Sequence, residues 1–320
     1  MKIDMPDTTV SKIQKKLVRI REEGGAVALG RVLTLIISTA LGHEEEAIEA
    51  ANEASREHPM RVIIVSKNSG DTKSPGRLDA QIRVGSDAGA SEVIVLRAYG
   101  ETATDEESLV TGLLLPDAPV VAWWPQTAPE QPAASALGRI AQRRITDAAA
   151  QKDPNGAIEA LGASYVPGDT DFAWTRLTLW RNQLAAALDQ PPYEPITAVE
   201  VSGASDSPST ILLAAWLQLQ LQVPVSVVTS PRATGSSGIH GVKLVRESGT
   251  IELERSLVDV ATLSMPGQPT HDLSLPRRNL RDCLAEELRR LDPDDLYGEV
   301  ISRGLAELLE TNEASVPDAI

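Results

Sequence analysis

Short apolar runs rich in β-branched residues alternate with amphipathic segments along the whole of this 320-residue chain. The runs 61–66 and 120–124 have the length and composition of buried strands. The segment 44–57 begins with three glutamates and stops before a proline, which is typical of a helix. Strands that alternate with helices favour partly parallel sheets, whereas adjacent short runs at 242–247 and 250–254 predict an antiparallel hairpin. The sequence therefore predicts the α/β class, with mixed sheets covered by helices.

A proline-rich segment divides the sequence into two lobes. The stretch 189–195 (Asp-Gln-Pro-Pro-Tyr-Glu-Pro) places three prolines close together, and proline neither continues a helix nor joins a central strand. The length of 320 residues is also about twice the usual domain size of roughly 100–200 residues. We therefore expect an N-terminal α/β domain over 1–190 and a C-terminal α/β domain over 196–320. Both lobes show strands and helices in the same order, which is compatible with a degenerate duplication of one unit.

The chain is strongly acidic, with a formal charge of -15. Without a cationic excess to displace counterions, neither nucleic acid nor an anionic membrane surface is an expected partner. Cys283 is the only cysteine, so no internal disulfide can form, which is typical of a reducing compartment. The sequence begins with acidic residues rather than with a signal peptide, and no apolar run approaches the roughly 20 residues of a membrane span. These features predict a cytoplasmic protein.

Motifs for catalysis and for metal binding are missing from the sequence. No serine lies in a G-x-S-x-G turn, and the four histidines show no H-E-x-x-H spacing. Cys283 lies in a helical pattern beside Leu280 and Leu284, which favours a buried structural thiol over a nucleophile. Carboxylate pairs such as Asp294 and Asp295 lie where an acidic surface or a helix start would place them. The sequence therefore predicts no catalytic residue, no metal site and no cofactor.

One strand-to-helix loop, 201–210, is a candidate site for a small anion. Backbone amides and the dipole at a helix start can hold a phosphate, and Ser207 followed by Pro208 predicts a helix start here. The spacing matches neither G-x-x-x-x-G-K-[ST] nor G-x-G-x-x-G, and Asp206 would repel an anion. An ordinary capped helix start is therefore the competing interpretation. The residues that would form the anion site are Gly203, Ser205, Ser207, Ser209 and Thr210.

Two neighbouring features have the composition of an interaction surface. Trp123 and Trp124 end a strand and point to opposite faces, so only one of them can enter a given core. Arg143 and Arg144 follow, and their guanidinium groups suit bidentate contacts with carboxylate or phosphate. We expect these four residues to contribute to a surface that binds a partner protein, because aromatic residues and arginine dominate interface hot spots. The alternative for the arginines is an internal salt bridge, to Asp147 or to a neighbouring strand.

Six segments that precede the proline-rich stretch carry a resemblance to a known family. They are Pro-Asp-Thr-Thr at 6–9, Arg-Glu-Glu-Gly-Gly-Ala-Val at 21–27, His-Pro-Met-Arg-Val-Ile at 58–63, Leu-Leu-Leu-Pro-Asp-Ala-Pro-Val-Val-Ala-Trp-Trp-Pro at 113–125, Arg-Arg-Ile-Thr-Asp at 143–147 and Leu-Thr-Leu-Trp-Arg at 177–181. On these residues the chain resembles the glucose-6-phosphate dehydrogenase assembly protein family, OpcA, of the actinobacterial type.

This resemblance implies a protein that binds glucose-6-phosphate dehydrogenase and promotes its active oligomer. Such a protein would control the NADPH supply from the oxidative pentose phosphate pathway without catalysing a reaction itself. The family is not defined by catalytic residues, so the resemblance assigns none to positions of this chain. The alternative function is that of an enzyme or sensor that binds a sugar phosphate through the loop at 203–210.

Overall fold

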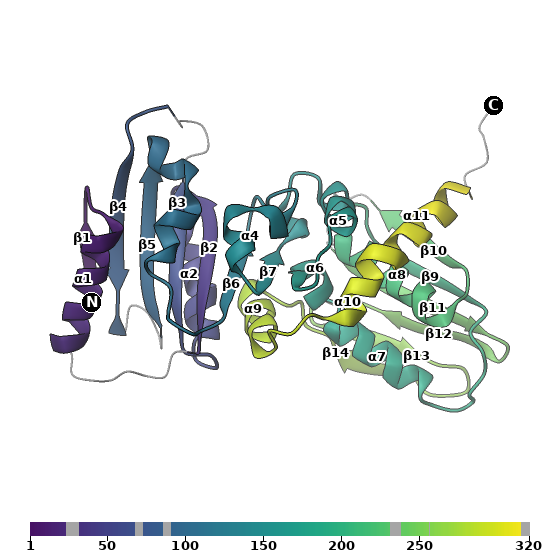
Figure 1. Ribbon diagram of the computed structural model, residues 1–320. Helices are drawn as coiled ribbons and strands as arrows, with labels where there is room; N and C mark the ends of the chain where they lie inside the picture. The colour runs from purple at the N-terminus through teal and green to yellow at the C-terminus, as the bar shows by residue number, and fades with distance from the viewer. Residues whose placement is uncertain (24–31, 68–72, 86–90, 231–237, 256, 315–320) are drawn as a thin grey trace. The chain divides into compact units, whose positions relative to one another are not determined.

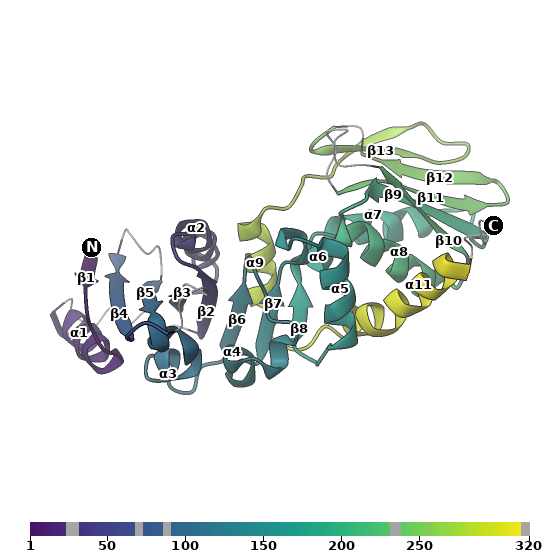
Figure 2. The same ribbon diagram turned by 90° about the horizontal axis from the view of Figure 1, so that it is seen from above.

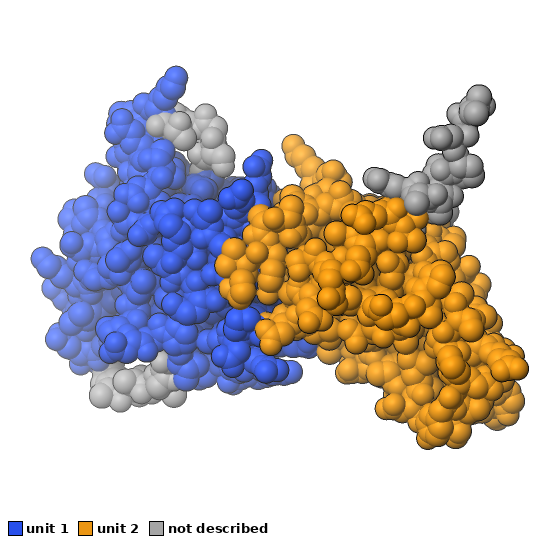
Figure 3. Space-filling view, turned by 45° about the vertical axis from the view of Figure 1, so that its right-hand side comes forward, with its two compact units in different colours: residues 1–147, 168–170, 279–293 blue, residues 148–167, 171–278, 294–320 orange. Residues whose placement is uncertain are grey.

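The computed structural model (Figure 1) describes residues 1–23, 32–67, 73–85, 91–230, 238–255 and 257–314. The chain forms two compact units, which Figure 3 distinguishes by colour. Unit 1 comprises Met1–Asp147, Gly168–Thr170 and Asn279–Pro293, and unit 2 comprises Ala148–Pro167, Asp171–Arg278 and Asp294–Ile320. This division does not coincide with the boundary expected between residues 190 and 196. Its main break follows residue 147, and two later segments return to unit 1.

Within the described residues, unit 1 is built on an eight-stranded mixed sheet with the order β1-β4-β5-β3-β2-β6-β7-β8. The pairs β2·β3, β2·β6, β3·β5 and β6·β7 are parallel, and β1·β4 and β4·β5 are antiparallel. From β5 to β8 the order is that of dinucleotide-binding doubly wound sheets. In such sheets the order in which strands are added reverses beside the first parallel strand, which is β2 here. The strands are β1 (Lys2–Met5), β2 (Leu33–Ala40), β3 (Met60–Lys67), β4 (Arg77–Arg83), β5 (Glu92–Tyr99), β6 (Val120–Trp124), β7 (Arg143–Thr146) and β8 (Asp169–Asp171).

Helices cover both faces of this sheet, which explains why its central strands are apolar on both sides. Figure 2 shows α2 and α9 on one face and α1, α3 and α4 on the other. Ile13 and Leu17 of α1 pack with Ile36 of β2 and Ile94 of β5 in one buried cluster. The predicted strands at 61–66 and 120–124 are confirmed as β3 and β6. The helices are α1 (Val10–Glu23), α2 (Glu44–Ala54), α3 (Glu106–Thr111), α4 (Ala136–Ile140) and α9 (Leu280–Arg289).

Unit 2 contains a six-stranded sheet in its described part, with the order β10-β9-β11-β12-β13-β14. Helix α8 (Pro208–Leu221) connects β9 to the parallel strand β10, and the other described pairs are antiparallel. The predicted hairpin at 242–254 is confirmed as β11 and β12. The strands are β9 (Ala198–Ala204), β10 (Val225–Ser230), β11 (Ile239–Arg246), β12 (Gly249–Glu254), β13 (Val260–Ser264) and β14 (His271–Ser274).

The core of unit 2 forms around α8, which is apolar on most of its circumference. Leu212, Leu213 and Leu217 of this helix are buried with Val201 of β9. The ring of Tyr297 lies 5.8 Å from that of Trp174, centroid to centroid, and extends the same core. The remaining helices of the unit are α5 (Pro154–Ala163), α6 (Phe172–Thr175), α7 (Thr178–Leu188), α10 (Asp295–Glu299) and α11 (Leu305–Ala314), with a π-helical turn at Val300–Gly304.

The two sheets confirm the α/β class with mixed sheets covered by helices. They do not support a duplication, because their topologies differ. Among the described strands the first sheet has parallel pairs on both sides of β2, whereas the second has one parallel pair followed by an antiparallel run. The similar order of helices and strands along the sequence therefore does not reflect one repeated unit.

A buried ion pair holds the returning segment 279–293 in unit 1. Arg143 Nη2 of β7 donates to Glu287 Oε2 of α9 at 2.5 Å, and both side chains are buried. Arg143 Nη1 donates to the carbonyl oxygen of Asp292 at 3.0 Å. Cys283 of the same helix is buried, as the sequence predicts for a structural thiol. Helix α9 is thus joined to the sheet by a charged contact that has little access to water.

We expect Glu287→Gln to lower the free energy of unfolding by about 3 kcal/mol, because removing one partner leaves the Arg143 charge buried without its counterion. Urea denaturation followed by tryptophan fluorescence measures the change. Arg289→Gln on the same helix is the control. Its ion pair with Glu57, 2.9 Å long, is exposed, so its loss costs less than about 1 kcal/mol. Equal losses of unfolding free energy in the two variants would contradict the role assigned to the buried ion pair.

Candidate functional site

The two tryptophans expected at a partner surface lie in the interior of unit 1. Trp123 and Trp124 are 0% and 3% exposed on β6. They point to opposite faces, as the strand geometry predicts. Because helices cover both faces of this sheet, each tryptophan packs in the interior on its own side of the sheet. Neither side chain is exposed to a partner protein. The prediction that they contribute to a binding surface is therefore not supported by their burial.

The two arginines are also buried, and both are used inside the chain. Arg143 binds Glu287, and Arg144 of β7 pairs through Nε with Asp169 of the neighbouring strand β8. Arg144 Nη1 also donates to the carbonyl oxygen of Ala141 at 2.9 Å. These contacts to Glu287 and Asp169 are internal salt bridges of the kind that the sequence left as the alternative. Burial removes Arg143 and Arg144 from the surface that a partner could reach.

The carboxyl ends of β2, β3 and β6 form the edge at which doubly wound sheets bind their ligands. A cavity of about 260 Å³ lies at this edge, and Ser38, Lys67 and Glu106 are among the residues that line it. Ser38 Oγ donates to Glu106 at 2.9 Å, and Lys67 Nζ approaches the same carboxylate to 2.9 Å. Thr39 Oγ1 donates to Gln126 Oε1 at 3.2 Å. The polar groups of this edge therefore bind one another.

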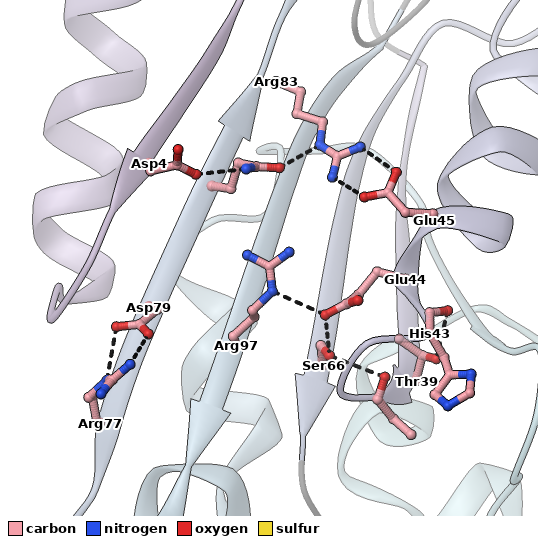
Figure 4. A network of polar contacts seen from close by, with 12 residues as sticks. Asp4, Thr39, His43, Glu44, Glu45, Ser66, Arg77, Asp79, Arg83 and Arg97 are labelled. Atoms are coloured by element: carbon pink, nitrogen blue, oxygen red, sulfur yellow. Dashed lines mark hydrogen bonds and ion pairs between the residues drawn. The ribbon is translucent and has the colours of Figure 1, made fainter.

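The turn from β2 to α2 is the place where a dinucleotide-binding sheet holds its pyrophosphate. Figure 4 shows that carboxylates occupy the helix start here. Glu44 accepts hydrogen bonds from Ser66 Oγ at 2.7 Å and from Arg97 Nε at 3.1 Å. Glu45 accepts two from the Arg83 guanidinium, at 2.9 and 2.5 Å. The protein's own anions thus take the position at the positive end of the helix dipole that a phosphate would otherwise occupy.

Both carboxylates are held in the ionised form. The hydrogen bond from Arg83 lowers the pKa of Glu45, with burial acting in the opposite direction. Burial raises the pKa of Glu44, but the hydrogen bond from Ser66, backbone hydrogen bonds and the charge of Arg97 together outweigh it. The pKa of Glu44 consequently lies below its ordinary value. The start of α2 therefore keeps its negative charge at neutral pH.

The residues of this edge do not fit a dinucleotide. The β2-to-α2 turn, 41–43, has Gly42 alone in place of a G-x-G-x-x-G series, with φ of +84°. The next three residues, 44–46, are glutamates, which repel a pyrophosphate. The end of β3, where such folds use an acidic side chain for the ribose hydroxyls, carries Lys67 instead. Unit 1 has the strand order of a dinucleotide-binding sheet, but the part of this edge that the structure describes does not supply the donors for the cofactor.

The loop at 203–210 begins α8 in unit 2, and its hydroxyl groups serve the fold. Ser207 caps the helix by accepting from the Thr210 amide at 3.2 Å, as predicted, and Thr210 Oγ1 donates to Ser207 Oγ at 2.9 Å. Ser209 Oγ donates to the carbonyl oxygen of Ala173 at 2.9 Å. A Cβ on Gly203 would stand 2.2 Å from Thr210 Oγ1, so this glycine allows the strand and helix to pack closely. Of the five expected anion ligands, Ser205 alone is exposed.

A cavity of about 280 Å³ lies beside this helix start, and all of its described lining belongs to unit 2. Ser207 and Ser209 contribute to the wall, so the loop predicted to hold an anion does border a pocket. Arginines dominate the charge of the lining, with one carboxylate among the residues described. The charged and aromatic residues of the lining are Arg176, Trp180, Asp206, Arg255, Arg277 and Arg278.

Sequence reasoning missed this group of arginines, because they come from the turn between α6 and α7, the residue after β12 and the segment before α9. Arg255 Nη1 donates to the carbonyl oxygens of Val258 and Leu275, both at 2.7 Å. Burial, and then the charge of Arg277, lowers the pKa of Arg255, with Asp259 acting in the opposite direction. The adjacent arginines at 277–278 were the available sign of this basic site in the sequence. Nothing in the sequence places them near Arg176 and Arg255.

Two further observations concern the described residues. No group of three or more histidine, cysteine, aspartate or glutamate side chains is arranged there to hold a metal ion. None of the helices in this part of the chain has both the length and the apolar character needed to cross a membrane.

We expect acid to weaken the fold through the start of α2. The folded pKa of Glu44 lies below its ordinary value of 4.5, so its charge stabilises the fold above that value. This stability is lost as the pH falls through the folded pKa. Glu44→Gln should lower the unfolding free energy at neutral pH by roughly 1–3 kcal/mol and flatten its fall below about pH 5. Urea midpoints between pH 7 and pH 3 measure both effects.

Glu46→Gln on the exposed side of the same helix start is the matched control. It should leave both the midpoint at neutral pH and the acid dependence close to those of the unmodified chain. A Glu44→Gln chain with unchanged stability and an unchanged acid dependence would remove the role assigned to this carboxylate.

Solved structures resemble the chain in fold. An oxidoreductase from Sinorhizobium meliloti matches with a TM-score of 0.51 at 11% identity, over 88% of this chain and 98% of that chain. A myo-inositol dehydrogenase from Lactobacillus casei, solved in complex with NAD(H) and myo-inositol, matches with a TM-score of 0.45 at 9% identity, over 88% and 95%. The first likeness supports the doubly wound fold alone. No protein with curated annotation matches the chain in sequence.

Two family models match the chain in sequence. The model described as the glucose-6-phosphate dehydrogenase subunit N-terminal domain matches residues 51–163. The model described as the C-terminal domain of the same subunit matches residues 167–301. Together the two matches take in most of both compact units. The chain therefore belongs to the OpcA family of glucose-6-phosphate dehydrogenase assembly subunits.

Proposed function

We propose that this chain is a non-catalytic subunit that binds glucose-6-phosphate dehydrogenase and promotes its active oligomer. The observation that carries the proposal is the match to both family models, whose descriptions name a subunit of that enzyme. In this role the chain raises the NADPH supply from the oxidative pentose phosphate pathway. The proposal includes a cytoplasmic location and an actinobacterial origin.

The chemistry of the carboxyl edge of unit 1 supports a role without hydride transfer. Glu44 and Glu45 occupy the helix start that would hold a pyrophosphate, and their guanidinium partners Arg97 and Arg83 keep them charged. A chain that cannot hold a nicotinamide dinucleotide at this edge cannot reduce one there. The dehydrogenase partner supplies the catalytic residues, and this chain supplies a surface.

Activation by such a subunit requires selective binding. A partner shifts an equilibrium between inactive and active forms only by its difference in affinity for the two, and each ~1.4 kcal/mol of difference shifts that equilibrium tenfold. The surface must therefore be stable in shape before binding, since ordering a mobile surface would consume part of this difference. An exposed aromatic side chain on a well-held segment is suited to this task.

Tyr193 of unit 2 meets this requirement and replaces the buried tryptophans as our proposed anchor. Its side chain is exposed over 78% of its surface. The residues on either side are attached to the β11–β12 hairpin, since Arg246 Nη1 donates to the Pro192 carbonyl oxygen and the Ser248 amide donates to Glu194 Oε2, each at 2.9 Å. Tyrosine combines a rigid apolar ring with a polar hydroxyl and is enriched in interface hot spots.

The alternative function, an enzyme or sensor that binds a sugar phosphate through the loop at 203–210, is not supported by either family match. The hydroxyls of Ser207, Ser209 and Thr210 are engaged in helix capping and packing. The loop borders a pocket whose described charged residues are four arginines and Asp206, and four cations beside one carboxylate suit the binding of an anion rather than acid–base catalysis.

The first experiment combines the purified chain with glucose-6-phosphate dehydrogenase from the same organism. We expect a faster rate of NADPH formation and a new co-eluting species in size-exclusion chromatography with light scattering. The chain alone, given glucose 6-phosphate and NADP⁺, should produce no NADPH. Absence of both a complex and a rate change would refute the proposal, and NADPH formation by the chain alone would refute its non-catalytic part.

Tyr193→Ala should raise the concentration of the chain needed for half-maximal activation by about tenfold or more, the loss typical of a hot-spot residue. Tyr193→Phe keeps the ring and is expected to stay within a few-fold of the unmodified chain. Val166→Ala, at another exposed apolar side chain of unit 2, is the control for non-specific effects. If Tyr193→Ala activates as well as the unmodified chain, the anchor lies elsewhere.

A further inference from the structure

The arginine-lined cavity of unit 2 is a feature that an assembly surface does not require. Arg176, Arg255, Arg277 and Arg278 converge on about 280 Å³ of space, with Asp206 the acidic member of the described lining. The whole chain carries a formal charge of -15, so a local excess of positive charge runs against its composition. Guanidinium groups that line one cavity can each donate hydrogen bonds to the oxygens of the same anion.

Two of these arginines, Arg255 and Arg278, are held in place by hydrogen bonds to residues outside the cavity lining. Arg255 is fixed by the carbonyl oxygens of Val258 and Leu275. Arg278 Nη1 donates to the carbonyl oxygen of Thr175 at 3.0 Å. Arg277 Nη1 lies 3.5 Å from the position a Cβ on Gly238 would occupy, so its guanidinium lies against the strand end beside the helix start. Such preorganised guanidinium groups bind phosphate without first losing side-chain freedom.

The backbone adds to the positive potential of the same cavity. Ser207, Pro208 and Ser209 begin the 14-residue helix α8 and line the cavity, so the positive end of the helix dipole faces it. Helix α8 follows strand β9, which pairs in parallel with β10, and the carboxyl end of a parallel pair is where α/β sheets bind ligands. The burial that lowers the pKa of Arg255 also strengthens its attraction for an anion, because little water screens it.

We propose that this cavity binds a small phosphate monoester with a polar body, of the size and chemistry of a phosphorylated sugar. Its volume of about 280 Å³ lies just below the range for small-molecule sites, roughly 300–1,000 Å³, and is too small for a dinucleotide. Guanidinium groups match the phosphoryl oxygens in bidentate geometry. The wall beside them includes Trp180, Ile239 and Pro276, which can pack against the carbon skeleton of the ester.

Binding to this cavity is a property of the chain alone and does not rest on the proposed function. Isothermal titration calorimetry at constant ionic strength, with the full chain and no dehydrogenase present, uses three probes: glucose 6-phosphate, glucose and inorganic phosphate. We expect glucose 6-phosphate to bind with a Kd below about 1 mM, inorganic phosphate to bind more weakly, and glucose not to bind. A loss of dehydrogenase activation would leave this result unchanged.

Arg277→Gln tests the site, because this exposed side chain can be changed without disturbing the core. It should weaken glucose 6-phosphate binding by about tenfold, the effect of losing one charge-assisted contact. Arg303→Gln is the matched control, since Arg303 is an exposed arginine of the same unit outside the cavity lining. Circular dichroism and the melting temperature confirm that both variants remain folded.

Three results would overturn the proposal. The first is no heat of binding for glucose 6-phosphate up to about 10 mM, which is weaker than any specific site of this kind. The second is an equal loss of affinity in Arg277→Gln and Arg303→Gln, which would indicate attraction to the overall charge rather than to the cavity. The third is that inorganic phosphate binds as tightly as glucose 6-phosphate. This result would show that the sugar part of the ligand contributes nothing to binding.

Discussion

Burial of the central strands of unit 1 on both faces is the constraint on which the rest of that unit depends. Helices lie on either side of β2, β3 and β6, so the side chains of each strand enter a core whichever way they point. Trp123 and Trp124 both fill this interior instead of facing a partner. The same burial forces the charged groups of β7 to pair internally, as Arg143 does with Glu287 and Arg144 with Asp169.

The carboxyl edge of this sheet shows how a fold can be kept while its usual ligand is excluded. The strand order is that of a dinucleotide-binding sheet, and the solved oxidoreductase with a TM-score of 0.51 shares the fold. Glutamates at the start of α2 stabilise the helix through its dipole and bind Arg83, Arg97 and Ser66. The positive end of this helix is thereby neutralised by carboxylates of the chain itself.

Unit 2 has the opposite electrostatics at the start of its own α8. There the helix end faces a cavity with four arginines among its described lining, and its serine and threonine hydroxyls are used for capping and packing. Anion recognition at this position would rest on guanidinium groups and the backbone, with the predicted hydroxyls in supporting positions. The contrast between the two helix starts follows from the residues placed on them, since both come after a strand of a parallel pair.

The sequence by itself determined those features that depend on local pattern. Alternating apolar runs and helical segments predicted the α/β class, Ser207 with Pro208 predicted the start of α8, and the missing motifs and the family resemblance pointed away from catalysis. Tertiary structure alone decided which faces are covered and which distant residues meet. It buried Trp123 and Trp124, returned residues 279–293 to unit 1, and gathered arginines from positions 176, 255, 277 and 278 around one cavity. These outcomes depend on long-range packing, which the spacing of residues along a chain does not encode.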